Sequence, residues 1–113
     1  MKVTSCEKDG IWVVEVKGQM MGGPDTIELD EILYSIVGKG CKRAVVDLAK
    51  CDWINASGLT ILTRHYKKFK DVGGELKLAN LMKKVKRVMV IARLTEVFDS
   101  CDCVDDAIAC FTS

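Results

Sequence analysis

The sequence predicts a single α/β domain built on a mixed central β-sheet of about five strands with about four helices. Two observations support this fold class. Short apolar runs rich in β-branched residues have the length of buried strands, and the stretches between them carry apolar residues at helical spacing. Intervening helices of ten or more residues act as crossovers between parallel strands. With 113 residues and no linker, we expect residues 1–113 to form one domain.

The N-terminal part predicts an antiparallel hairpin and then a helix. Val3 to Cys6 and Ile11 to Val16 are strand-like, and Asp9-Gly10 between them is typical of a tight turn. Pro24 can begin a helix because its missing N–H would be unpaired in the first turn. We expect this helix to end at Gly38-Lys39-Gly40 and to face the core with Ile27, Ile32, Leu33 and Ile36.

The middle of the chain predicts a strand, a polar turn and a second helix. Ala44 to Leu48 is the strand, after which the chain is expected to break and to restart as a helix from Gly58. The helix is expected to end at Gly73-Gly74. Its predicted buried stripe consists of Leu59, Leu62, Tyr66 and Phe69.

The C-terminal part predicts two more strands and two more helices. Glu75 to Ala79 is the fourth strand, a fifth lies near Val97-Phe98-Asp99, and the last helix runs from about Val104 to Cys110. Strands three to five are expected to be parallel. The third helix is expected to place Lys83, Lys84, Lys86 and Arg87 outward and to face the core with Met82, Val85, Val88, Met89 and Ala92.

Composition excludes several classes of function. A formal net charge of +1 argues against binding of nucleic acid or membranes by the whole molecule. No run has the length of a signal peptide or a membrane span, so we expect a cytoplasmic protein that does not insert into membranes. In that compartment the six cysteines are expected to be reduced thiols.

Charge is distributed unevenly along the chain. Between Thr60 and Leu94 there are ten Lys or Arg and two acidic residues, whereas Thr95 to Ser113 has five acidic residues and no basic one. Such an asymmetry could mark a face for an acidic partner. Solvated faces of soluble helices explain it equally well.

No catalytic or metal constellation is predicted. His65 is the only histidine, and it lies ~12 Å along a helix from Ser57, so the two cannot share a proton. We expect it at the surface or at a boundary. Cys101, Cys103 and Cys110 could hold a soft metal, but they lack the paired spacing of zinc sites. We therefore predict no catalytic residues, no cofactor and no metal.

The segment Asn55-Ala56-Ser57-Gly58 lies where a strand leads into a helix, and we expect the function there. Small polar residues at a helix N-terminus leave backbone N–H groups available, and the helix dipole favours an anion beside them. Asn55 or Ser57 could equally cap the helix with its own side chain.

The runs Val45-Val46-Asp47-Leu48 and Trp53 to Leu59 resemble the STAS domain family, which includes bacterial anti-sigma factor antagonists. Gly18, Gly73 to Leu76 and Leu94 to Phe98 match as well, together with Val85 and Arg87. The resemblance covers nearly the whole chain and implies the STAS fold.

The resemblance also implies a phosphorylation switch, from which this chain departs. Antagonists of the family carry Asp-Ser-Ser/Thr/Ala-Gly-Leu at this turn, and a partner kinase phosphorylates the first Ser. Here Ala56 occupies that position and Asn55 replaces the Asp. Ser57 matches the second, usually unmodified position, and it remains a candidate phosphoacceptor.

The resemblance implies a bacterial, non-enzymatic module for protein–protein interaction in signal transduction and transcription regulation. The expected partner is a kinase-type anti-sigma factor or a STAS-based regulatory assembly, and the free protein is expected to be a monomer. The expected contact residues are Asn55, Ala56, Ser57, Gly58, Leu59 and Leu62. The alternative is a nucleotide- or anion-binding STAS module that serves a transporter, a lipid-trafficking complex or a signalling scaffold.

Overall fold

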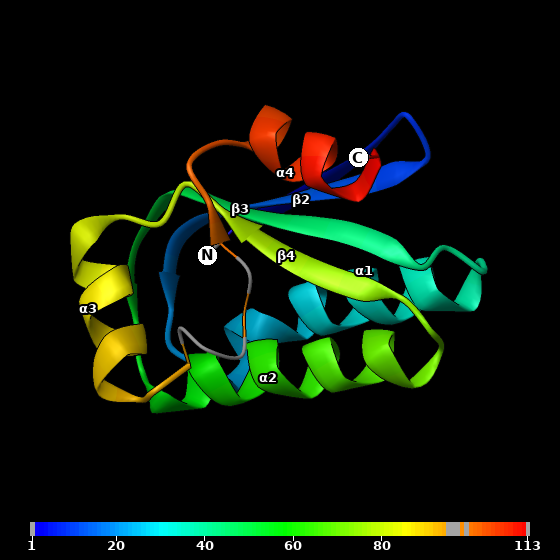
Figure 1. The fold of residues 1–113 in the computed structure, drawn as a ribbon. Helices are drawn as coiled ribbons and strands as arrows, with labels where there is room; N and C mark the ends of the chain where they lie inside the picture. The colour runs from blue at the N-terminus through cyan, green and yellow to red at the C-terminus, as the bar shows by residue number, and fades with distance from the viewer. Residues whose placement is uncertain (1, 95–97, 99, 113) are drawn as a thin grey trace.

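A computed structural model describes residues 2–94, 98 and 100–112 and shows a mixed sheet with helices on both faces (Figure 1). The strands follow one another across the sheet in sequence order. They are β1 (Lys2–Lys8), β2 (Ile11–Met20), β3 (Arg43–Ile54), β4 (Glu75–Ala79) and β5 (Ser100–Cys101). The helices are a 3₁₀ turn, η1 (Gly23–Thr26), and α1 (Ile27–Gly38), α2 (Ala56–Asp71), α3 (Lys83–Ile91) and α4 (Val104–Thr112).

The predicted fold class is confirmed, including the strand directions. β1 and β2 pair antiparallel, whereas β2–β3, β3–β4 and β4–β5 are parallel. The hairpin turns at Asp9 and Gly10, whose φ values of 56° and 79° are those that a two-residue turn of this twist requires.

Three strands are longer than predicted, and β1 extends by one residue before Val3 and two after Cys6. β3 continues to Ile54 and β2 to Met20, although the sequence indicated a break after Leu48. Exposed polar residues interrupt the apolar run in the second half of β3, so the sequence pattern did not indicate a strand there. Its pairing with β2 shifts register between Glu15 and Lys17 and between Gly18 and Gln19. The strand therefore leads directly into α2, with only Asn55 between them.

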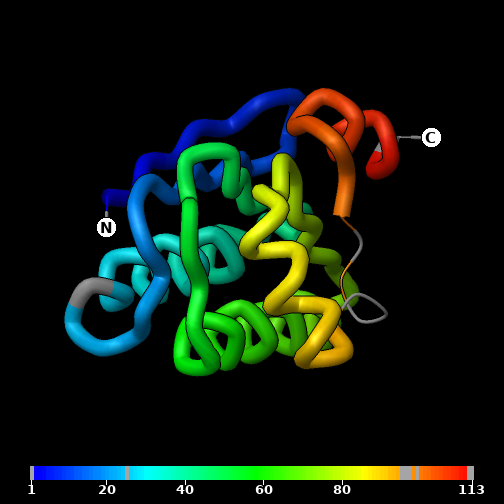
Figure 2. Tube along the Cα trace, turned by 90° about the vertical axis from the view of Figure 1, so that its left-hand side faces the viewer, coloured from blue at the N-terminus to red at the C-terminus, as the bar shows by residue number. Residues whose placement is uncertain are grey.

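The main core lies between the sheet and the helices α1, α2 and α3. Its buried residues include Val46, Leu62, Phe69 and Met89. A smaller cluster beneath α4 covers the other face. Figure 2 shows α3 running beside the last part of β3, so that both end next to the start of α2. This arrangement brings three elements to one end of the domain.

Three residues predicted to face the core are exposed instead. Ile27 is 53% exposed because η1 precedes it, and buried Thr26 and Leu29 fill the positions around it. Met82 and Ala92 flank α3 as its end caps, where the chain turns away from the sheet.

The predicted fifth strand is present, but it begins later in the sequence than predicted. β5 is Ser100–Cys101. Phe98 precedes it in a bend, and its buried ring packs edge-to-face on the ring of Tyr66, with centroids 5.0 Å apart. Val97 and Asp99, which the prediction included, lie outside the described residues. Within the described ranges, no helix is long and apolar enough to cross a membrane.

Candidate functional site

The junction between β3 and α2 is organised by the side chain of Asn55. Its Oδ1 accepts a hydrogen bond from the Gly58 N–H at 2.9 Å, which makes Asn55 the N-cap of α2. Its Nδ2 donates to the carbonyl oxygen of Met21 at 2.8 Å. The Asn55 N–H also donates to the carbonyl oxygen of Met20, so one residue ties the end of β2 to the start of α2.

An Asp at this position could fill only one of these two roles. A carboxylate could cap α2, but it has no N–H to donate to the Met21 carbonyl oxygen. The close contact is reinforced at Gly58, where a Cβ atom would overlap the carbonyl oxygen of Met20 and would lie 2.8 Å from Cγ1 of Ile54. The start of α2 is thus held firmly against β2 and β3.

Ala56 and Ser57, the first two residues of α2, are both exposed but point in different directions. Consecutive helical residues are rotated by about 100° around the axis. Ser57 lies against the loop after β2, where a Cβ on Gly22 would be 2.5 Å from the Ser57 Cβ. Ala56 instead lines a groove on the side of α3.

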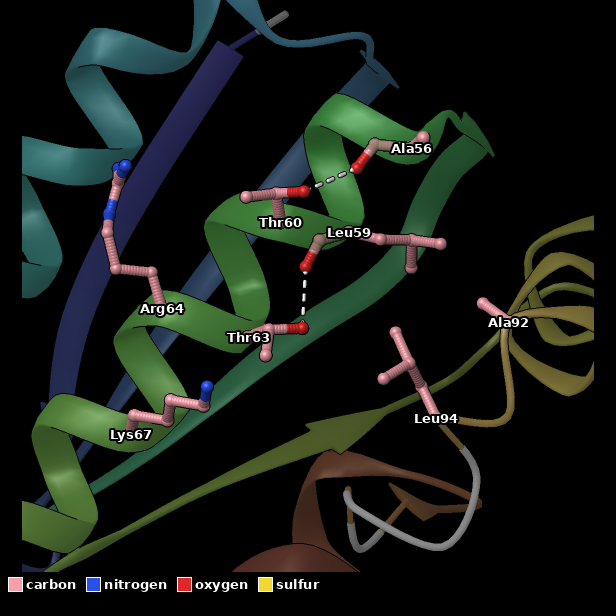
Figure 3. A pocket seen from close by; sticks show the side chains of 8 residues that line it. All are labelled: Ala56, Leu59, Thr60, Thr63, Arg64, Lys67, Ala92 and Leu94. Atoms are coloured by element: carbon pink, nitrogen blue, oxygen red, sulfur yellow. Dashed lines mark hydrogen bonds between the residues drawn. The ribbon is translucent and has the colours of Figure 1, made fainter.

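That groove has a volume of about 550 Å³ and lies between α2 and the segment after α3 (Figure 3). Ala56 and Leu59 face Ala92 and Leu94 across it. The Thr60 and Thr63 hydroxyls donate to backbone carbonyl oxygens of their own helix, so mainly their acceptor capacity remains. We call this the α2 groove.

The expected contact residues do not all reach the surface. Ala56 and Ser57 are exposed and Asn55 is half-buried, whereas Leu59 is only 6% exposed. Gly58 is buried and Leu62 is completely buried in the core, so the Leu62 side chain cannot contact a partner in this conformation. The accessible surface includes Thr60 and Ala92, which the sequence did not indicate.

The expected anion position is largely occupied. Of the N–H groups at Ser57 to Leu59, the Gly58 N–H donates to Asn55 Oδ1 and the Leu59 N–H donates to the Asn55 carbonyl oxygen. The Asn55 cap therefore satisfies donors that an anion would need.

The prediction that His65 lies at the surface or a boundary is wrong. Its side chain is 1% exposed and packs edge-to-face on Tyr34, and its Nε2–H donates to Oδ1 of Asp30 on α1 at 2.6 Å. Arg64 Nη2 donates to the same oxygen at 2.7 Å. His65 thus joins α2 to α1 and points away from the α2 groove.

Burial and pairing shift the pKa values in this cluster. Burial lowers the pKa of His65, and the hydrogen bond with Asp30 counteracts this only in part, so the imidazole is neutral at pH 7. Burial alone would raise the pKa of Asp30, but hydrogen bonds from His65 and Arg64 outweigh it and lower that pKa. The carboxylate therefore accepts both hydrogen bonds at neutral pH.

The cysteines form no disulfide, and all six lie within the described residues. The Sγ atoms of Cys101 and Cys110 are 3.9 Å apart, whereas a disulfide bond is about 2.05 Å long. In the part of the chain that the structure describes, no group of three or more His, Cys, Asp or Glu side chains is arranged to hold a metal ion.

Comparison with known proteins identifies the family. Residues 3–107 match the STAS domain family. A candidate anti-sigma factor antagonist of Bordetella bronchiseptica, BtrV, is 30% identical over 98% of this chain and 95% of its own length.

Solved structures share the fold. The crystal structure of an anti-sigma factor antagonist from Mycobacterium paratuberculosis superposes with a TM-score of 0.86, at 22% identity, over 99% of this chain and 94% of its own. A candidate antagonist from Thermotoga maritima gives 0.85 at 16% identity, over 95% and 92%. Because the family match spans nearly the whole sequence and the Bordetella relative is matched along almost its full length, this chain belongs to the STAS domain family.

Proposed function

We propose that this protein is a cytoplasmic, non-enzymatic anti-sigma factor antagonist that contacts its partner through the start of α2 and cannot be switched off by phosphorylation at the usual position. One observation carries the proposal: Ala56 is the exposed first residue of α2, lines the α2 groove and has no hydroxyl. The family places its phosphorylated Ser at this position. The expected partner is a kinase-type anti-sigma factor or a STAS-based assembly.

The physical basis of the switch is electrostatic. A phosphate at this position would bring about two negative charges into a close protein contact, and the repulsion and desolvation would release the partner. Ala56 cannot carry that phosphate. The protein then acts as a permanently unphosphorylated binder, and its abundance or competition for the partner regulates it.

Ser57 does not replace the missing hydroxyl. Its side chain is directed toward Gly22 and is rotated by about 100° from that of Ala56. A kinase that aligns its γ-phosphate with the first position needs an in-line hydroxyl there, so Ser57 is a poor substrate without rearrangement.

The test is a phosphorylation assay with a kinase-type anti-sigma factor from the same organism. Wild-type protein should show no mass increase with ATP, whereas Ala56→Ser combined with Asn55→Asp should gain one phosphate. Ala56→Asp should weaken binding to the kinase, and Ala56→Gly is the uncharged control. One phosphate mapped to Ser57 in wild-type protein, with loss of binding, would overturn the constitutive interpretation.

The nucleotide- or anion-binding alternative has less support, because the Asn55 cap already engages the Gly58 N–H at the start of α2. Isothermal titration with nucleotides separates the two functions. Our proposal expects no saturable heat, and tight nucleotide binding would favour the alternative.

A further inference from the structure

A second groove lies next to the α2 groove, between the end of β3 and one face of α3. It has a volume of about 400 Å³ and is lined by Trp53, Lys84, Arg87, Val88 and Ile91. We call it the α3 groove. Trp53 is 38% exposed and Ile91 is 76% exposed. Isolated apolar residues on a surface are common, but here three gather around one hollow and one is a Trp, a residue enriched at binding hot spots.

The four α3 residues form a single stripe. Lys84, Arg87, Val88 and Ile91 stand at spacings of three, four and seven residues, which places them on one helix face. The buried residues Val85 and Met89 lie on another face. Lys84, Arg87 and Ile91 are exposed, whereas Val88 is half-buried and also packs against the main core. The stripe thus presents an apolar centre and two cations to the outside.

The charge of the stripe lacks a partner within the described chain. Arg64, Lys50 and Lys70 each form an ion pair with a carboxylate. In contrast, neither Lys84 nor Arg87 forms an ion pair with any residue that the structure describes. The charged residues of α3 are all basic, so its outward side attracts negative charge.

We propose that the α3 groove binds a segment of the protein partner that carries one large apolar side chain flanked by carboxylates. The apolar side chain packs between Trp53, Val88 and Ile91. The flanking carboxylates pair with Lys84 and Arg87. A hollow bounded by cations suits a protruding side chain better than a flat lipid surface does.

The two grooves adjoin each other at the end of α3. Ile91 lines the α3 groove and the next residue, Ala92, lines the α2 groove opposite Ala56. One partner can therefore cover both. The inference rests on the proposed function, because it assigns the chemistry of a second contact with the same partner.

The test uses the 113-residue chain with Trp12→Phe, which leaves Trp53 as the only indole. The probe is a short synthetic peptide with a central Leu flanked by Glu on both sides. Titration should shift the Trp53 emission to shorter wavelength and saturate, and added salt should weaken the affinity. Peptides with Lys in place of Glu, or Ser in place of Leu, are the probe controls.

Matched variants locate the binding surface. Lys84→Glu with Arg87→Glu should weaken peptide binding by about tenfold, because two attractive pairs become repulsive. Lys83→Glu with Lys86→Glu changes the charge of the same helix by the same amount outside the stripe. It should weaken binding by less than about threefold at physiological salt, where charges beyond ~8 Å are screened.

Four outcomes would overturn the inference: no saturable shift, equal binding of the Lys peptide, equal effects of the two double variants, or tighter binding to vesicles of phosphatidylserine and phosphatidylcholine than to the peptide. The phosphorylation assay on the Asn55→Asp, Ala56→Ser protein does not involve this groove. A failed titration with successful phosphorylation therefore overturns only the α3 groove, and the reverse result overturns only the proposed function.

Discussion

The helices α2 and α3 meet at the same end of the domain but begin in opposite ways. Asn55 caps α2 with its side chain, whereas Met82 at the start of α3 makes no side-chain cap. α2 carries Lys68 and Lys70 in its last turn, where cations complement the helix dipole. α3 carries Lys83 and Lys84 in its first turn, where they oppose it.

The packing of the two helices also favours α2. α2 buries six residues along its length, while α3 buries only Val85 and Met89. Local choices that lower stability without a structural benefit are typical of functional surfaces. α2 is therefore the fixed frame that positions Ala56, whereas the uncapped start, the basic first turn and the small buried face of α3 contribute little to its own stability.

The largest expected effect tests the rigidity of the α2 frame. Gly58→Val should lower the free energy of unfolding by at least about 3 kcal/mol, because its Cβ would overlap the Met20 carbonyl oxygen and its branches would add to the clash. Gly38→Ala is the control, since a Cβ there meets nothing within 4 Å. It should raise stability by up to about 1 kcal/mol. Chemical denaturation measures both, and a tolerated Gly58→Val would show that the frame can move.

The second effect concerns the link from α2 to α1. Because the pKa of His65 in the folded protein lies below its ordinary value of 6.5, the unfolded chain takes up a proton first as the pH falls. Stability should therefore be complete above about pH 6.5 and should decline as the pH falls toward the folded pKa. Denaturation curves across this window should show that slope.

Two variants isolate the residue responsible for this slope. His65→Gln should lower stability at pH 7 by about 1–3 kcal/mol and should flatten the profile, since no other histidine titrates there. Asp30→Asn removes the group that raises the His65 pKa, so the slope should persist. A profile unchanged by His65→Gln would assign the slope to other groups.

The third effect measures the Asn55 cap. Asn55→Ala removes both side-chain hydrogen bonds and should cost about 2 kcal/mol. Asn55→Asp keeps the cap acceptor and loses only the bond to Met21, so about 1 kcal/mol is expected. Thermal unfolding should rank the proteins in that order, and equal losses would mean that the Met21 bond adds nothing. The smaller loss leaves the Asp variant folded for the phosphorylation assay.

Much of the fold followed from periodicity and turn residues, because these report local geometry directly. The Asp9-Gly10 hairpin, the strand Glu75–Ala79 and the parallel order are of this kind. The second half of β3 was missed because only every third residue after Leu48 is buried, namely Cys51 and Ile54, and its pairing with β2 shifts register. A search for apolar runs does not detect such a strand.

The site was only partly predictable. Asn55 and Ala56 could be located because the strand-to-helix junction and the family motif coincide there. The burial of His65 depends on Asp30, which lies 35 residues earlier on another helix, and no spacing rule connects them. Likewise, Trp53 and Ile91 are distant in sequence and meet only because α3 packs alongside β3. The helical spacing of Lys84, Arg87, Val88 and Ile91 was the one signal that could have revealed the stripe.

The smallest expected effect addresses the weak start of α3. Met82 has the extended backbone of an N-cap, with φ −67° and ψ 154°, but no side-chain oxygen to accept a bond from the first turn. Met82→Ser supplies one and should raise the free energy of unfolding by about 0.5–1 kcal/mol. Met82→Ala removes the same apolar side chain without adding a cap, so the difference between the two variants isolates the capping bond. Neither variant should alter peptide binding in the α3 groove, which Met82 does not line. If the Ser and Ala variants were equally stable, the N–H groups in the first turn of α3 would gain nothing from a side-chain cap. The difference between α2 and α3 would then lie only in charge and burial.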